Sequence, residues 1–329
     1  MSKQTADLIA YNGKIATQNE QRSIIEAVAV LDGKFLAVGT DREVMAYRGE
    51  QTQLINLNKR TAIPGLNDSH THLIRGGLNY NLELRWDGVP SLADGLRMLR
   101  EQARRTPTGQ WVRVVGGWSE FQFAERRMPT LDELNKAAPD TPVFVLHLYD
   151  RALLNRAALR AVGYTKESPN PPGGEIVRDA AGNPAGVLIA RPNAMILYST
   201  LAKGPQLPPD YQLNSSRHFM RELNRLGITS VIDAGGGFQN YPDDYRIVEQ
   251  LHRRGQLTVR IAYNLFTQKP KGELEEPVVI VPKTCDLENV LVVYTAWPWE
   301  PARNASDRKI CGSSVARSWA RRRMPFTTA

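Results

Sequence analysis

PGLNDSHTH, residues 64–72, is the stretch of sequence that most constrains the fold and chemistry of this chain. Side chains alternate along a β-strand, so His70 and His72 would point to the same face, with Asp68 on that face as well. Neutral imidazole is a common ligand of transition metals, and a nearby carboxylate can hold the tautomer of a ligating histidine. The spacing predicts a metal site with His70 and His72 as ligands and Asp68 orienting them. Two histidines two residues apart also arise by chance at surfaces or in satisfied cores, and the pattern alone leaves that alternative open.

The chain before this motif has the pattern of a small β-rich module. Short apolar strands flank two dipeptides, Asn12-Gly13 and Asp32-Gly33. Both dipeptides favour the positive-φ turns of two-residue hairpins. We therefore expect a hairpin at each place, within an N-terminal β-sandwich module over residues 1–60.

From Thr61 onward the pattern alternates between strands and helices, which is typical of βα units and a largely parallel sheet. The expected strands are Thr61–Leu66, Trp111–Val115, Pro142–His147, Ile228–Asp233 and Leu257–Leu265. Ser91 and Thr130 have the capping pattern that begins a helix, and Gly227 and Gly255 the pattern that ends one. A complete TIM barrel needs eight strands and about 250 residues. The predicted fold class is therefore α/β, with an incomplete TIM-type (β/α) barrel over residues 61–276.

Two segments depart from this alternation. A Pro/Gly-rich stretch with two apolar runs around a DAAGN turn predicts a hairpin insertion near residues 174–190, outside the main sheet. Residues 277–329 form an atypical C-terminal tail, which holds both cysteines and three of the six tryptophans and shows no further helix, glycine, strand step. We interpret the tail either as a subdomain of its own or as non-native, frame-shifted coding after Glu276, which would leave the barrel truncated.

Composition and charge are those of an ordinary globular chain, with 42% hydrophobic and 23% charged residues. The formal net charge is +8, but the tail holds eight Lys/Arg against four Asp/Glu, which accounts for half of it. No basic stripe interleaved with aromatic residues precedes the tail, so we expect no nucleic-acid partner. No signal-peptide core and no run of about 18 apolar residues is present, so we expect a cytoplasmic chain without membrane contact. Two cysteines so placed predict neither a disulfide framework nor a zinc knuckle.

Taken together, these segments resemble the amidohydrolase superfamily. NGKI and AVLDGKFLAVG lead into PGLNDSHTH, and GQWVRVVGGW, MPTLDELNKAAPDTPVFVLHLYDRALLNRAAL and GGEIVRDAAGNPAGVL are similar to its YtcJ-like branch, also called the amidohydrolase 3 family. The resemblance covers about residues 5–275. It implies a distorted TIM barrel with one or two divalent ions, usually zinc, that activate a water for attack on a C–N bond, typically of an amide or formamide. Only His70 and His72 carry over as ligands; the lysine, two later histidines and aspartate of the family have no match.

Four further residues are candidates for the substrate pocket. His147 ends a predicted strand, where it could face the barrel mouth, although a substrate-side or structural position fits it better than metal ligation. Asp233 also closes a predicted strand and either faces the catalytic rim or caps local backbone. Trp118 either walls the pocket or packs in the core. Asp150-Arg151 stands where many relatives carry a Gly-His pair, which makes Arg151 the fourth candidate.

The sequence therefore predicts a metal-dependent hydrolase that acts on carbon–nitrogen bonds other than peptide bonds, in a small amide-like substrate. Two histidines fall short of the three protein ligands typical of catalytic zinc, so we expect weak or absent turnover from this chain. The alternatives are a non-catalytic regulatory or binding protein derived from an amidohydrolase, or a product whose open barrel edges prevent stable folding. Zinc, iron, manganese and nickel fit two imidazoles about equally well.

Overall fold

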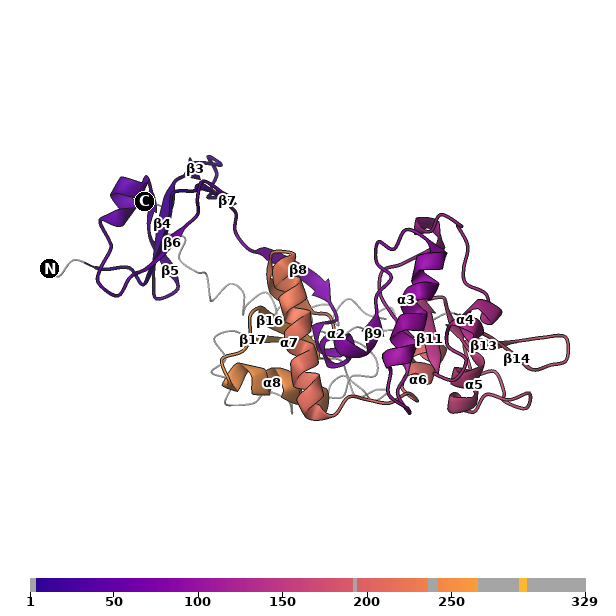
Figure 1. Ribbon diagram of the computed structural model, residues 1–329. Helices are drawn as coiled ribbons and strands as arrows, with labels where there is room; N and C mark the ends of the chain where they lie inside the picture. The colour runs from indigo at the N-terminus through magenta and orange to yellow at the C-terminus, as the bar shows by residue number, and fades with distance from the viewer. Residues whose placement is uncertain (1–3, 192–193, 236–241, 266–289, 295–329) are drawn as a thin grey trace, which may run out of the picture. The chain divides into compact units, whose positions relative to one another are not determined.

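The computed structural model describes residues 4–191, 194–235, 242–265 and 290–294 (Figure 1). The chain divides into two compact units, of which one comprises Met1–Asn67 with Gly227–Ser230 and the other Asp68–Leu226 with Val231–Ala329. The architecture is mixed α/β, as predicted. Its strands lie in four separate sheets, and the described residues form no closed barrel.

The first unit contains two small β-sheets, with the strand orders β5-β4-β1-β6 and β3-β2-β7. Their strands are β1 (Leu8–Tyr11), β2 (Lys14–Ala16), β3 (Ile24–Ile25), β4 (Ala27–Leu31), β5 (Lys34–Gly39), β6 (Gln53–Asn56) and β7 (Thr61–Ala62). One short helix, α1 (Asp41–Met45), packs against β4 and β5. Its Val44 is fully buried together with Ile9 and Ala29, and these residues form the centre of a small apolar core.

Only one of the two predicted N-terminal hairpins forms. At Asp32-Gly33 both residues have positive φ, 51° and 71°, and β4 pairs antiparallel with β5, which confirms that hairpin. At Asn12-Gly13 the prediction is wrong, because β1 pairs with β4 and β6 whereas β2 pairs with β3 and β7. Asn12 does have a φ of 55°, but its N–H donates to the Asp41 carboxylate at 2.8 Å. The bend therefore sends the chain from one sheet to the other.

The largest sheet lies in the second unit and has the strand order β13-β14-β12-β11-β10-β9. Its strands are β9 (Glu83–Leu84), β10 (Val112–Val114), β11 (Val143–His147), β12 (Arg151–Leu154), β13 (Gly174–Arg178) and β14 (Pro184–Ala190). The first three are parallel and the last three antiparallel. The predicted hairpin over 174–190 is confirmed. Its predicted place outside the sheet is wrong, because β14 pairs directly with β12.

Strand β11 shows why this sheet is stable. Val143 and Val145 pack in one apolar cluster, and Phe144 and Leu146 pack in another. Side chains alternate between the two faces of a strand, so both faces of β11 are covered. The first cluster is centred on tryptophan and phenylalanine rings, Trp118 among them. A strand buried on both faces has a continuous apolar run, as residues 143–146, VFVL, do.

Helices begin where the capping residues predict. Ser91 accepts from the N–H of Asp94 at 3.0 Å, and Thr130 accepts from the N–H of Glu133 at 3.2 Å. The helices of the second unit are α2 (Leu73–Asn79), α3 (Leu92–Arg105), α4 (Leu131–Ala137), α5 (Arg156–Val162), α6 (Met195–Leu201), α7 (Pro209–Arg225) and α8 (Arg246–Arg253), with short 3₁₀ turns η1 (Tyr80–Leu82), η2 (Glu120–Gln122) and η3 (Asp243–Tyr245). None of these described helices is long and apolar enough to span a membrane.

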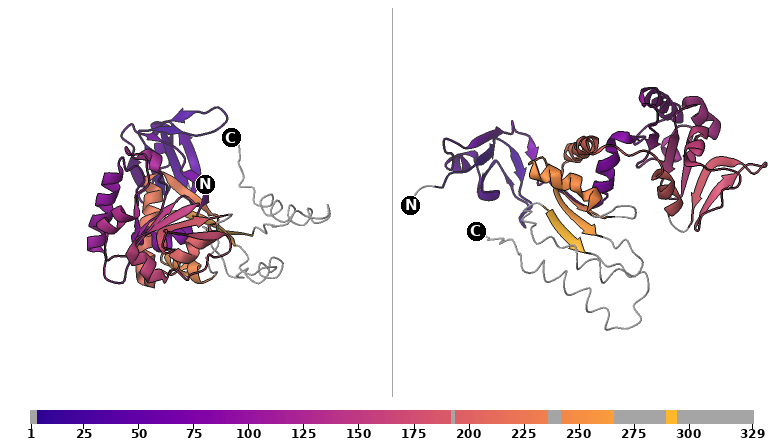
Figure 2. Two further views of the ribbon diagram at one scale, coloured as in Figure 1. Left: turned by 90° about the vertical axis from the view of Figure 1, so that its right-hand side faces the viewer. Right: turned by 90° about the horizontal axis from the view of Figure 1, so that it is seen from below.

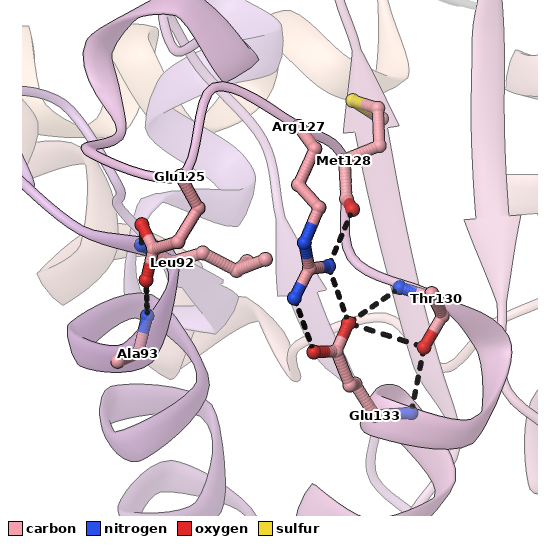
Figure 3. A network of polar contacts seen from close by, with 7 residues as sticks. All are labelled: Leu92, Ala93, Glu125, Arg127, Met128, Thr130 and Glu133. Atoms are coloured by element: carbon pink, nitrogen blue, oxygen red, sulfur yellow. Dashed lines mark hydrogen bonds and ion pairs between the residues drawn. The ribbon is translucent and has the colours of Figure 1, made fainter.

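Figure 3 shows how the segment before α4 is tied to two helix starts. Thr130 and Glu133 form a reciprocal capping box at the start of α4. Arg127 donates to both carboxylate oxygens of Glu133, at 2.7 and 2.9 Å, and these bonds hold the pKa of Glu133 down to about 2. Glu125 accepts from the first two backbone N–H groups of α3, at 2.8 and 3.1 Å. A carboxylate there is also favoured by the helix dipole.

The histidine motif lies on a third sheet, with the strand order β17-β16-β15-β8. Its strands are β8 (Leu66–Thr71), β15 (Ile228–Asp233), β16 (Arg260–Leu265) and β17 (Val290–Tyr294). The predicted strand Thr61–Leu66 is wrong in extent. Residues 63–65 belong to no strand, and Pro64 lacks the N–H that a continuous ladder requires. The motif itself therefore forms β8.

A strand also forms within the segment predicted to be an atypical tail. Strand β17 pairs in parallel with β16, and the two run side by side in the right-hand view of Figure 2. This strand lies in the one part of the predicted tail that the structure describes, residues 290–294. The two tail cysteines, Cys285 and Cys311, lie outside the described residues.

Candidate metal site and its cavity

The two motif histidines lie where β8 leads into α2. His70 is in the strand, and His72 immediately precedes the helix. Their ring centroids are 5.6 Å apart, with the ring planes at 78°. His70 is exposed and His72 is partly buried. The structure thus brings the two imidazoles together at the end of one strand, where a single ion could contact both.

The surroundings of His72 fit the role of a metal ligand. Its Nδ1 lies 2.5 Å from the carbonyl oxygen of Gly235, which follows β15. A carbonyl oxygen only accepts, so Nδ1 carries the proton and the lone pair of Nε2 is left for a metal ion. Burial, and then the nearby Arg75, lower the pKa of His72. The neutral imidazole, which is the ligating form, is thereby favoured.

Two carboxylates hold the backbone around this pair. Asp68 accepts from the backbone N–H of His70 at 3.0 Å, so its bond is to the main chain and not to an imidazole. Asp233, fully buried at the end of β15, accepts from the first turn of α2 at 3.1 Å and from the N–H of Gly235 at 3.2 Å. Burial raises the pKa of Asp233, and its backbone hydrogen bonds oppose that rise. Asp233 thus fixes the two segments that meet at the His72 ring.

The donor set around the motif is small. Within the described ranges of the chain, no group of three or more His, Cys, Asp or Glu side chains is placed to hold a metal ion. The candidate centre therefore consists of His70 and His72, and Asp68 and Asp233 act through the backbone.

The other three pocket candidates are engaged elsewhere in the second unit. Trp118 is 1% exposed in the apolar core and donates its indole N–H to the carbonyl oxygen of Leu146 at 2.9 Å. His147 is 5% exposed, and its Nε2 lies 2.7 Å from a carboxylate oxygen of Glu120. The same two rings, of Trp118 and His147, are in edge contact. Trp118 and His147 therefore pack around the end of β11.

The turn after β11 is held by contacts to the carboxylate of Asp150. The Nδ1 of His147 lies 3.1 Å from Asp150, and Arg151 pairs with the same carboxylate at 2.9 Å. Hydrogen bonds from His147 and Arg151 lower the pKa of Asp150 against the effect of its burial. Neither His147 nor Arg151 lines the cavity beside His72.

A cavity of about 490 Å³ adjoins His72. Charged side chains on its wall include Arg75, Glu83, Arg85 and Arg113, and aromatic rings and leucines supply much of the rest. Our sequence reasoning missed all four of these residues. One signal was present for Arg113, because a charge inside the apolar run WVRVV is rarely buried without a partner or a function.

The charged wall is largely shielded from solvent. The Glu83 side chain is 10% exposed and pairs with Arg85 at 2.6 Å. Burial raises the pKa of Glu83 to about 7, although Arg85, Arg113 and Arg75 all act to lower it. Arg113 is 5% exposed, and burial lowers the pKa of its guanidinium group. It donates to the carbonyl oxygen of Pro205.

We expect the Glu83→Gln variant to gain stability relative to the wild type as the pH rises. The folded pKa of about 7 exceeds the ordinary value of 4.5, so between these values the folded chain holds a proton that the unfolded chain has released. The wild type therefore loses stability as the pH rises through this window, and glutamine does not titrate. The difference in unfolding free energy should shift by about 2–3 kcal/mol in favour of the variant between roughly pH 5 and roughly pH 8.

Urea unfolding at the two pH values measures this shift. Glu175→Gln, at an exposed position of β13, is the matched control. An equal pH dependence in the two variants would contradict the burial of Glu83 as the cause.

Comparisons with known proteins show what the chain is similar to. Residues 53–300 match the family model for amidohydrolases, so the similarity continues past residue 276. The putative amidohydrolase YtcJ of Bacillus subtilis is 35% identical over 57% of this chain and 36% of its own length. The N-substituted formamide deformylase of Arthrobacter pascens is 29% identical over 70% of this chain and 43% of its own length. The chain thus spans less than half the length of these curated relatives.

A solved structure is similar in fold. An uncharacterized metal-dependent hydrolase from Pyrococcus furiosus superposes with a TM-score of 0.54 at 18% identity, over 86% of this chain and 54% of that one. At this level of identity the likeness concerns the fold alone.

Proposed function

This chain belongs to the amidohydrolase family, and on that premise we propose that it is a metal-dependent hydrolase of carbon–nitrogen bonds other than peptide bonds, with His70 and His72 as metal ligands. The observation that carries the proposal is the 2.5 Å contact between Nδ1 of His72 and the carbonyl oxygen of Gly235. It assigns the ring proton and leaves Nε2 for an ion. A deformylase of N-substituted formamides among the relatives supports an amide or formamide as the substrate class.

Each residue of the centre has a distinct part in the proposal. His70 and His72 hold a divalent ion, for which we propose zinc, at the end of β8. Such an ion supplies Lewis acidity and lowers the pKa of bound water toward 7. Asp233 holds the start of α2 and the Gly235 segment together, and Asp68 holds the backbone of His70.

The proposal extends to the strength of the activity. Catalytic zinc sites typically have three protein ligands, and the candidate centre offers two imidazoles. We propose that this chain binds zinc through both histidines and turns over a small amide-like substrate slowly.

Two measurements on the purified full chain test the proposal. Zinc is titrated into metal-free protein, and formate release is followed with a panel of N-alkyl and N-aryl formamides. We expect one zinc ion per chain and zinc-dependent formate release. Zinc binding without hydrolysis of any member of the panel would favour the alternative, a non-catalytic binding protein. Absence of zinc binding would rule out the metal centre.

A further inference from the structure

We propose that the cavity beside His72 binds the carboxylate of an acidic substrate through Arg75 and Arg113, so that the substrate is a small N-acyl compound with both a carboxylate and an apolar group. This inference rests on the proposed function, since it names the substrate class of the same site. It starts from an excess of arginine on the cavity wall. Three arginines line the cavity, Arg75, Arg85 and Arg113, but only two acidic residues do, Glu83 and Asp244.

Only one of the three arginines forms an ion pair with a described carboxylate. Arg85 pairs with Glu83 at 2.6 Å. Arg75 and Arg113 form no ion pair with any carboxylate in the part of the chain that the structure describes. The Arg75 guanidinium lies 4.7 Å from the centroid of the Tyr198 ring, which also lines the cavity. Stacking on an aromatic face keeps a guanidinium oriented without cancelling its charge.

Arg113 is the stronger indication, because it is 5% exposed. Its Nε is enclosed and has no hydrogen-bond partner among the described residues. Its one hydrogen bond to a described residue runs from Nη2 to the carbonyl oxygen of Pro205, which bears no charge. Glu83 lies opposite Arg113 in the strand register, but its ion pair is with Arg85, so no ion pair with a described carboxylate balances the buried charge of Arg113. A carboxylate in the cavity would supply that partner.

The position of Arg75 connects this charge to the metal site. Arg75 lies in the first turn of α2, which begins directly after His72, and both residues line the same cavity as Glu83. A substrate whose carboxylate contacts Arg75 and Arg113 would therefore extend toward His72. The apolar part of the wall, which includes Leu78, Leu146 and Phe219, suits a hydrocarbon group. A volume of about 490 Å³ lies within the usual range for small-molecule sites.

The test compares two ligands that differ only in charge. N-formylleucine and its neutral amide, N-formylleucinamide, are titrated into the metal-free full chain in the presence of a chelator, with binding followed by calorimetry. We expect the carboxylate to bind roughly tenfold more tightly or better, because charge-assisted hydrogen bonds to arginine are stronger than neutral ones. Equal affinities, or no detectable binding of the carboxylate, would overturn the inference.

Variants identify the residues. Arg75→Gln should remove most of the preference for the carboxylate, and Arg75→Lys should restore part of it by keeping the charge. Arg100→Gln, an exposed arginine of α3 that does not line the cavity, is the matched control and should keep the full preference. The inference is wrong if Arg75→Gln and Arg100→Gln behave alike.

Two further arms separate possible sources of the signal. Acetate alone should bind at least about tenfold more weakly than N-formylleucine, since it lacks the apolar and formyl groups. An equal affinity would reveal a general anion site and overturn the assignment of a substrate.

Because these titrations contain no metal, they do not depend on the proposed function. A His70→Ala chain that keeps the carboxylate preference after losing zinc supports the anion site, whatever becomes of the hydrolase proposal.

Discussion

Replacing His72 by alanine is expected to lower the zinc affinity of the chain by at least about a hundredfold and to abolish zinc-dependent hydrolysis. Removing a group that merely orients a ligand typically costs 10–100-fold in metal affinity, and removing the ligand itself costs more. The variant leaves His70 as the single imidazole at the end of β8. Competition with a chromophoric zinc chelator measures the affinity of the wild type and the variant under the same conditions.

His70→Ala should give a loss of similar size, because the proposal makes the two rings equal partners of one ion. The matched control is His218→Ala, an exposed histidine of α7 whose Nδ1 lies 3.0 Å from the side-chain oxygen of Asn81. Its zinc affinity should stay within about twofold of the wild type. If all three variants lose zinc equally, binding is not located at the motif. If neither His70→Ala nor His72→Ala loses zinc affinity, the proposed metal centre at these two histidines is wrong.

The local part of this site could be predicted from the sequence, because its geometry depends on neighbours in the chain. A spacing of two residues at the end of a strand is enough to bring the rings of His70 and His72 together. The helix starts at Ser91 and Thr130 also follow from residues three positions apart. In such cases the partners lie within one turn of backbone, and pattern and structure agree.

Contacts between distant segments could not be predicted in this way. The carbonyl oxygen that holds His72 belongs to Gly235, 163 residues further along the chain. Arg113 meets Glu83 only because β10 pairs in parallel with β9. The Asn12-Gly13 turn fails as a hairpin for the same reason, because pairing of β2 with β7 outweighs the local preference for a reversal. Strand pairing of this kind depends on the whole sheet and leaves no local pattern.

The burial of the pocket candidates could not be predicted from the sequence. The sequence left Trp118 and His147 open between a pocket and a structural position, and both side chains are almost fully enclosed. In contrast, all three residues of β10, Val112–Val114, are buried, so the alternation that would have singled out Arg113 is missing. The arginine is recognisable as unusual only when its surroundings are known.

Replacing Asn155 by alanine is expected to lower the free energy of unfolding by about 4 kcal/mol. The side chain is fully buried, and all of its hydrogen bonds go to backbone groups. Its oxygen accepts from the N–H groups of Val143 and Ala158, both at 2.9 Å, and its nitrogen donates to the carbonyl oxygens of Ala138 and Thr141 at 2.6 and 2.9 Å. Each buried backbone group left without a partner costs at least about 1 kcal/mol.

Urea unfolding of the full chain measures this loss, and two further variants show its origin. Asn155→Asp keeps an acceptor for both N–H groups but brings a negative charge against the two carbonyl oxygens, so it should also be destabilised, by about 2 kcal/mol or more. Asn183→Ala, in the exposed turn between β13 and β14, should cost less than about 1 kcal/mol. If Asn155→Ala and Asn183→Ala were equally mild, water would be replacing the four hydrogen bonds of Asn155.

Because Asn155 joins the start of β11 to the start of α5 and touches neither motif histidine, the folded fraction of Asn155→Ala should keep its zinc affinity. That result would separate the stability of the sheet from the chemistry of the metal site.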